Sequence, residues 1–176
     1  MLNTLETLCA LRGVSGREDE VRDYILEQAL PYADETATDP MGNLYIFKKG
    51  AVSPAEPVMI CAHMDEVGII VTDITDEGYL KFDFIGGVDR RVVIGKRVSV
   101  GDGGIPGVIG LKAIHLTGES ERKQAPRTAQ MQVDIGCRSR EEAEKLVTLG
   151  DTGVFDDHIV EFGAGFLRAR AIEIGR

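Results

Sequence analysis

The sequence predicts an α/β fold in which a small β-barrel interrupts a layer of helices and buried strands. Apolar residues recur at helical spacing within residues 2–30, whereas short alternating runs separated by glycines dominate from Ile69 onward. The chain also contains 21 glycines in 176 residues, which favours many tight turns between short strands. We therefore expect helices first, a barrel second, and a return to the first layer at the end.

Two helices are expected at the N-terminus. Leucines recur at helical spacing between residues 2 and 11, and Gly13 is placed for a left-handed C-terminal cap. The S-x-x-E motif from Ser15 to Glu18 predicts a capping box at the start of the second helix. Pro31 is expected to end that helix, because proline cannot continue the hydrogen-bond ladder.

Three strands are expected in the next part of the chain. Residues 35–38 and 43–48 form short alternating runs around the turn residues 39–42, which predicts a hairpin. Residues 58–62 then form a continuous apolar run, which is typical of a strand buried on both faces. We expect this run to be a central strand of the first layer.

The barrel is expected to follow directly. A second S-x-x-E motif, at Ser139, predicts a short helix among its strands, and residues 165–176 alternate like one further strand. The barrel strands are predicted at residues 69–74, 79–84, 97–100, 105–109 and 129–135.

Composition excludes several classes of function. Lys and Arg number 20 against 29 Asp and Glu, and the resulting net charge of -9 gives no general attraction to phosphate, so no nucleic acid partner is expected. No apolar run approaches the length of about 20 residues that a membrane span needs, and no secretory signal pattern is present, so we expect no membrane partner and a cytoplasmic location. The three widely spaced cysteines are predicted to be reduced and mostly buried.

One compact polar group stands on an apolar background, at residues 61–68 after the predicted central strand. In an extended chain His63 and Asp65 project to the same side, so the carboxylate can hold the imidazole while the other ring nitrogen meets a metal ion. A purely structural His–Asp pair is an equally good reading of this spacing. The other two histidines are weaker candidates. His115 has no acidic neighbour in the sequence, and His158 follows two aspartates in an expected surface turn.

Five motifs in order strengthen the metal reading. They are SGRE (15–18), DPMGN (39–43), AHMDEVG (62–68), PGVIG (106–110), and DIG (134–136) followed by SREEA (139–143). Together they closely resemble the dinuclear metal-dependent aminopeptidases of the glutamyl aminopeptidase type. That family includes the tetrahedral (TET) peptidases, and some relatives carry an endoglucanase label.

The resemblance implies a zinc-peptidase-like αβα catalytic domain, present in part, with an inserted PDZ-like β-barrel. It assigns the first part of the catalytic domain to residues 1–68, the inserted barrel to 69–161, and a return strand to 162–176. The implied reaction is the removal of N-terminal amino acids from peptides with two divalent metal ions, zinc or cobalt. Full-length members are expected to assemble as homo-oligomers, from dimers to dodecamers.

By the same resemblance His63 is a metal ligand and Asp65 is the catalytic-site residue that orients it. Glu173 falls where the family has a bridging aspartate, which makes it a candidate second ligand, although the following Ile174 departs from the family pattern. The remaining ligands have no counterparts in this sequence. We therefore expect an N-terminal half of such an enzyme that holds at most one metal ion weakly and is inactive alone.

Two functions from other classes stay open. In one, the barrel is an assembly unit and the peptidase part is only scaffold. In the other, the chain binds peptides along barrel edge strands by β-augmentation. A half-domain should also expose a sheet edge and apolar faces, which predicts self-association.

Overall fold

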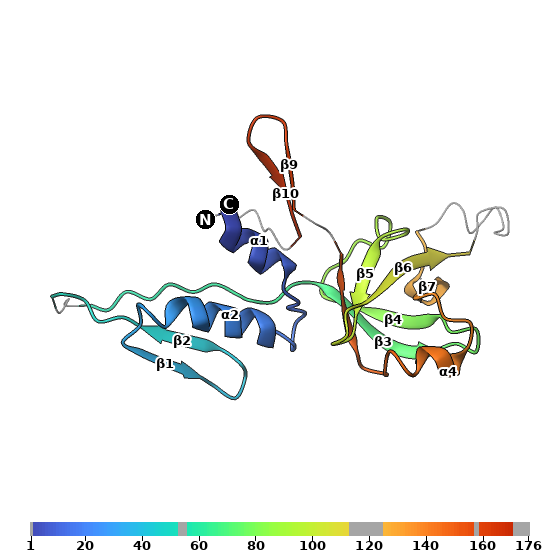
Figure 1. The fold of residues 1–176 in the computed structure, drawn as a ribbon, viewed down its shortest axis with the longest axis horizontal. Coiled ribbons are helices and arrows are strands. Elements are labelled where there is room, and N and C mark those ends of the chain that lie inside the picture. Colours follow the sequence, from blue (N-terminus) through green and yellow to red (C-terminus); the bar gives the residue numbers. More distant parts are fainter. Residues whose placement is uncertain (1, 53–55, 113–124, 157–158, 171–176) are drawn as a thin grey trace.

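The computed structural model describes residues 2–52, 56–112, 125–156 and 159–170. Figure 1 shows two parts side by side: two helices and a hairpin on one side, and the barrel on the other. Residues 56–67 form an extended segment that leads into the barrel, and a second hairpin near the C-terminus projects away from both parts. The mixed α/β class and the barrel are as predicted. No helix in the described ranges combines the length and apolar character needed to cross a membrane.

Both predicted N-terminal helices are present, as α1 (Leu2–Ala10) and α2 (Asp19–Ala29), but their predicted caps are wrong. Helix α2 begins after Glu18, and no side chain caps its N-terminus. The Ser15 hydroxyl donates instead to Asp65, and the Glu18 carboxylate accepts from the backbone N–H of Gly16. A tertiary contact has therefore replaced the local capping box.

Gly13 is not in the left-handed region, so its predicted role as a C-cap is also wrong. It is required for a different reason. A Cβ at this position would lie 2.8 Å from Cγ2 of Val21 and 3.1 Å from the carbonyl oxygen of Met64. Glycine here lets the N-terminal segment approach both α2 and residue 64 closely.

The predicted hairpin is confirmed as β1 (Glu35–Thr38) and β2 (Leu44–Phe47), an antiparallel pair beside α2. Its turn is held by Asp39, whose Oδ1 accepts from the backbone N–H groups of Met41 and Asn43 at 2.9 and 3.0 Å. Gly42 supplies the positive φ, 88°, that the turn needs.

The predicted central strand at 58–62 is wrong. These residues are extended but pair with no described strand, and the side chains of Val58, Met59 and Ile60 are 88%, 83% and 92% exposed. A strand forms when a neighbour satisfies its backbone groups and covers its apolar side chains, and no described element does either. Cys61 is exposed for the same reason and Cys137 is partly exposed, so the prediction that the cysteines are mostly buried is wrong for all but Cys9.

Six antiparallel strands form a closed barrel in the order β3-β4-β7-β6-β5-β8. The five strands predicted in this region are all present, with small shifts at their ends. The sixth, β8, was not predicted, because it is short and carries Gly153 in its middle. The strands are β3 (Gly68–Ile74), β4 (Leu80–Ile85), β5 (Arg97–Val100), β6 (Ile105–Leu111), β7 (Met131–Asp134) and β8 (Thr152–Phe155), and the 3-10 turn η2 (Thr128–Gln130) precedes β7.

Alternate residues of these strands point inward and form the main core. The helix predicted after Ser139 is α4 (Arg140–Ala143), and the Ser139 hydroxyl accepts from the N–H of Glu142 as expected. It is a single turn that covers the core with Ala143. The most buried large side chains of the core are Ile69, Ile74, Leu80, Ile109, Met131, Val71, Val98, Val100, Val133 and Val147.

The barrel joins the N-terminal part at Gly68. A Cβ there would lie 2.5 Å from the carbonyl oxygen of Gly153 and 2.6 Å from Cγ2 of Val14, so only glycine fits without displacement. Val14 is itself 1% exposed. The junction is thus closely packed, and it immediately follows the His63–Asp65 pair in the chain.

The last described elements are β9 (Val160–Phe162) and β10 (Phe166–Arg168), which pair as a separate hairpin. The single strand predicted at 165–176 is therefore represented by β10, while residues 171–176 lie outside the described ranges. The rings of Phe162 and Phe166 stack with centroids 5.8 Å apart, and both are exposed.

Candidate functional site

The His63–Asp65 pair lies where the N-terminal segment meets the start of the barrel. Residues 13–15 run beside residues 65–66: Val14 and Glu66 form a parallel bridge, and the N–H of Glu66 donates to the carbonyl of Gly13 at 2.7 Å. This short backbone pairing brings together side chains that are 50 positions apart in the sequence.

His63 and Asp65 interact as predicted. Nδ1 of His63 is 2.9 Å from Oδ1 of Asp65 and 3.0 Å from its backbone carbonyl oxygen. Because both neighbours are acceptors, Nδ1 carries the ring proton, and the tautomer is thereby assigned. The His63 side chain is 59% exposed, so the ring lies at the surface of the junction.

A third side chain completes this group. The Ser15 hydroxyl donates to Oδ2 of Asp65 at 2.5 Å, so each carboxylate oxygen has its own partner. The hydrogen bond from Ser15 is the main reason that the pKa of Asp65 is lowered, and His63 lowers it further. The sequence motif around Ser15 had suggested only a helix cap.

The described residues do not by themselves fit a catalytic zinc ion. Such a site takes about three protein ligands and keeps one open position. Within the described ranges, no three His, Cys, Asp or Glu side chains are close enough together to hold a metal ion. Three sequence candidates, His115, His158 and Glu173, lie outside the described residues.

A buried ion pair lies directly beside the site and was missed from the sequence. Nε of Arg170 is 3.0 Å from Oε2 of Glu66, and the two side chains are only 10% and 8% exposed. Arg170 also donates from Nη1 to the carbonyl of Phe155 at 2.9 Å and from Nη2 to the carbonyl of Leu11 at 2.5 Å. One guanidinium therefore ties the N-terminal segment, the barrel and residue 66 together.

The Glu66 carboxylate is incompletely satisfied. Its Oε1 has no hydrogen-bond partner among the described residues. Burial raises the pKa of Glu66 above its ordinary value, although the Arg170 guanidinium opposes this effect. The motif AHMDEVG contains Glu66, but nothing in the sequence links it to a residue 104 positions later (170 − 66).

The raised pKa of Glu66 determines the sign of a pH effect. A carboxyl whose pKa is higher in the folded chain than in the unfolded chain stabilises the fold below its unfolded pKa, and this stabilisation is lost as the pH rises through the folded pKa. As the pH rises from the unfolded pKa of Glu66 to its folded pKa, we expect the free energy of unfolding of the wild type to fall relative to that of Glu66→Gln. Urea unfolding of both proteins at a series of pH values measures the difference.

The exposed Glu27→Gln on α2 is the matched control, and it should follow the wild type closely. A Glu66→Gln curve parallel to that of the wild type, or a difference of opposite sign, would contradict the prediction.

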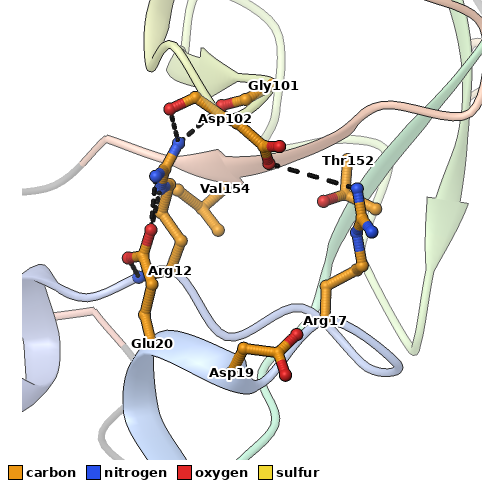
Figure 2. Close-up of a pocket in the computed structure, with 8 residues that line it drawn as sticks. All are labelled: Arg12, Arg17, Asp19, Glu20, Gly101, Asp102, Thr152 and Val154. Atoms are coloured by element: carbon orange, nitrogen blue, oxygen red, sulfur yellow. Dashed lines mark hydrogen bonds and ion pairs between the residues drawn. The ribbon is translucent and has the colours of Figure 1, made fainter. Parts of the chain in front are cut away.

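A separate cavity of about 240 Å³ opens between the N-terminal segment and the barrel. Figure 2 shows Arg12 and Arg17 on opposite sides of it, both facing the turn at 101–102. Arg12 donates to the carbonyls of Gly101 and Asp102 at 2.6 and 2.8 Å and pairs with Glu20, which lowers the pKa of that carboxyl. Neither member of the His63–Asp65 pair is among the lining residues, which are Arg12, Arg17, Asp19, Glu20, Gly101, Asp102, Thr152 and Val154.

The described structure thus defines a mixed α/β protein with a closed antiparallel barrel and a His–Asp–Ser group at the junction of its two parts. The sequence model of the M42 glutamyl aminopeptidases matches residues 42–173. The chain therefore belongs to the M42 family, a family of metal-dependent aminopeptidases.

Individual relatives agree with this assignment. A candidate aminopeptidase of Acetivibrio thermocellus is 40% identical over 155 residues, which cover 88% of this chain and 44% of the relative. The crystal structure of a TET aminopeptidase from a marine sediment thaumarchaeon matches with a TM-score of 0.86 and 36% identity over 93% of this chain and 47% of that one. The TET1 peptidase of Pyrococcus horikoshii, which can assemble into a tetrahedron or a large octahedral shell, matches with a TM-score of 0.83 and 34% identity over 96% and 50%. The chain spans about half the length of these proteins.

Proposed function

We propose that this chain forms part of a metal-dependent aminopeptidase that releases N-terminal amino acids from peptides. In this proposal His63 contributes one metal ligand, Asp65 orients it, and Glu173 is a further candidate ligand. The corresponding full-length enzyme would use two divalent ions, zinc or cobalt. Membership of the M42 family supports the reaction class.

The observation that carries the proposal is the geometry of His63 within the motif AHMDEVG. Asp65 accepts a hydrogen bond from Nδ1–H of His63, which is the arrangement that prepares the other nitrogen of an imidazole to be a metal ligand. Since no three potential ligands lie together among the described residues, we further propose that the chain alone holds at most one ion weakly and does not catalyse the reaction.

The test is an assay of the purified chain with a panel of amino-acid p-nitroanilides and added Zn²⁺ or Co²⁺. We expect no release of p-nitroaniline above the rate of a protein-free blank. A full-length M42 aminopeptidase in the same buffer is the positive control. Release that depends on metal and disappears in His63→Ala would show that this chain is an active enzyme by itself and would refute its proposed inactivity.

Assembly and domain organisation belong to the same proposal. We propose peptides as substrates and homo-oligomers as the functional state, supported by the assemblies that the P. horikoshii relative forms. Four features stay predictions. They are the division into residues 1–68, 69–161 and 162–176, the zinc-peptidase-like first part, the PDZ-like nature of the barrel and the cytoplasmic location. The exposed apolar residues at 58–60 are consistent with the expected self-association.

The alternative of peptide binding along barrel edges is not favoured. The six strands are ordered in a closed barrel, so each strand has a neighbour on both sides and little edge is left for an added strand. A non-catalytic assembly role built on the barrel stays open, and saturable binding of this chain to a full-length homologue would support it.

A further inference from the structure

We propose that Ser15 is a positioning residue whose hydroxyl orients Asp65, which in turn orients the imidazole of His63. This inference deepens the proposed function and rests on it for the role of His63 as a metal ligand. The hydrogen-bond relay itself is a property of the metal-free chain and can be tested separately.

The first argument is that the two oxygens of the Asp65 carboxylate have different partners. Oδ2 accepts from the Ser15 hydroxyl at 2.5 Å, and Oδ1 faces Nδ1 of His63 at 2.9 Å. The terminal torsion of an aspartate is broad, so one contact alone leaves the carboxylate plane poorly defined. A partner on each oxygen restricts that rotation and hence the plane in which the imidazole lies.

The second argument is that the backbone is built to place Ser15 there. Val14 pairs with Glu66, and the N–H of Glu66 donates to Gly13, so the segment is aligned with residues 65–66 on the side preceding Ser15. After Ser15 the chain turns back at once, with the N–H of Arg17 donating to the carbonyl of Val14 at 2.7 Å. Ser15 therefore lies in a short turn whose backbone is held by hydrogen bonds on both sides.

The third argument is that Ser15 does not cap the helix that follows it. In a capping box its hydroxyl would accept from the backbone N–H of Glu18, while the Glu18 carboxylate would reach back to the N–H of Ser15. Here the Glu18 carboxylate accepts from Gly16 instead, and α2 begins without any side-chain cap. The hydroxyl is directed across the junction to Asp65, away from its own helix.

The test is the tautomer of His63, measured by ¹⁵N NMR of the imidazole in the metal-free chain at a fixed pH above the ordinary histidine pKa. The His63→Gln variant identifies the signals. We expect the wild type to hold the Nδ1–H form, and Ser15→Ala to raise the ratio of Nε2–H to Nδ1–H, because a carboxylate that is freer to rotate holds the Nδ1–H less well. The upper limit is roughly tenfold, the shift expected if the whole His63–Asp65 hydrogen bond were lost. Ser15→Thr, which keeps the hydroxyl, should restore the ratio of the wild type.

Asp65→Asn is the comparison variant, because it alters the direct partner of the ring. A shift of the tautomer in Asp65→Asn without any shift in Ser15→Ala would overturn the role of Ser15, and so would failure of Ser15→Thr to restore the ratio. Far-UV circular dichroism shows whether each variant remains folded. No activity or metal binding enters this readout, so failure of the proposed enzymatic function would leave its outcome unaffected.

Discussion

Replacing Arg170 with alanine is expected to lower the free energy of unfolding by about 3–5 kcal/mol, the range found when one partner of a buried ion pair is removed. Arg170 and Glu66 are both at least nine-tenths buried. In Arg170→Ala the Glu66 carboxylate would remain inside the junction without its counter-charge. The carbonyls of Leu11 and Phe155 would each lose a charged donor as well.

Two further variants show whether the ion pair is the cause. Arg170→Lys keeps a positive charge but lacks the planar guanidinium that donates to two carbonyls while pairing with Glu66, so an intermediate loss is expected. Adding Glu66→Gln to Arg170→Ala should recover part of the loss, because the unpaired charge is then removed. Urea unfolding of the four proteins that make up the double-mutant cycle measures this coupling. A loss below about 1 kcal/mol for Arg170→Ala, or the absence of coupling to Glu66, would contradict the proposed tie.

Replacing Leu80 with alanine is expected to lower the free energy of unfolding by about 2–5 kcal/mol, as for other leucine truncations in closely packed cores. Leu80 is 0% exposed and opens β4. Its backbone faces Ile74 on β3 and Val133 on β7, so it lies where three barrel strands meet. A void at this position has closely packed strands on several sides, which limits its collapse.

The matched control is Leu111→Ala on β6, where the leucine is 37% exposed. Truncation there removes the same atoms from a surface that water already reaches, so a loss of about 1 kcal/mol or less is expected. The chain has no tryptophan, and far-UV circular dichroism is therefore the signal to follow. Equal losses in Leu80→Ala and Leu111→Ala would show that the barrel interior is not packed as described.

Local patterns were sufficient for much of this fold. The barrel strands were predicted from period-two alternation, and the cap at Ser139 from its S-x-x-E motif, because each signal depends on residues a few positions apart. The His63–Asp65 contact was also predictable, since residues two apart in an extended chain project to one side. The family resemblance rested on the same local motifs.

The same reasoning failed where a partner decides the outcome. Residues 58–62 have the composition of a buried strand, yet they lie exposed because no described strand pairs with them. The motif at Ser15 is as good a capping box as the one at Ser139, but only the second caps a helix. The local difference is the following residue: Gly16 after Ser15 has a φ of 85°, outside the helical region, whereas Arg140 after Ser139 begins α4.

The sequence by itself therefore determined the class of the chain, the barrel strands and the histidine that opens the candidate site. Only the tertiary structure decided which side chains surround that histidine. Ser15, Glu66 and Arg170 meet because the backbone at 13–15 pairs with 65–66 and the chain returns to the junction at residue 170. Such contacts depend on the path of the whole chain, and their free energy is realised only when distant segments have been brought together.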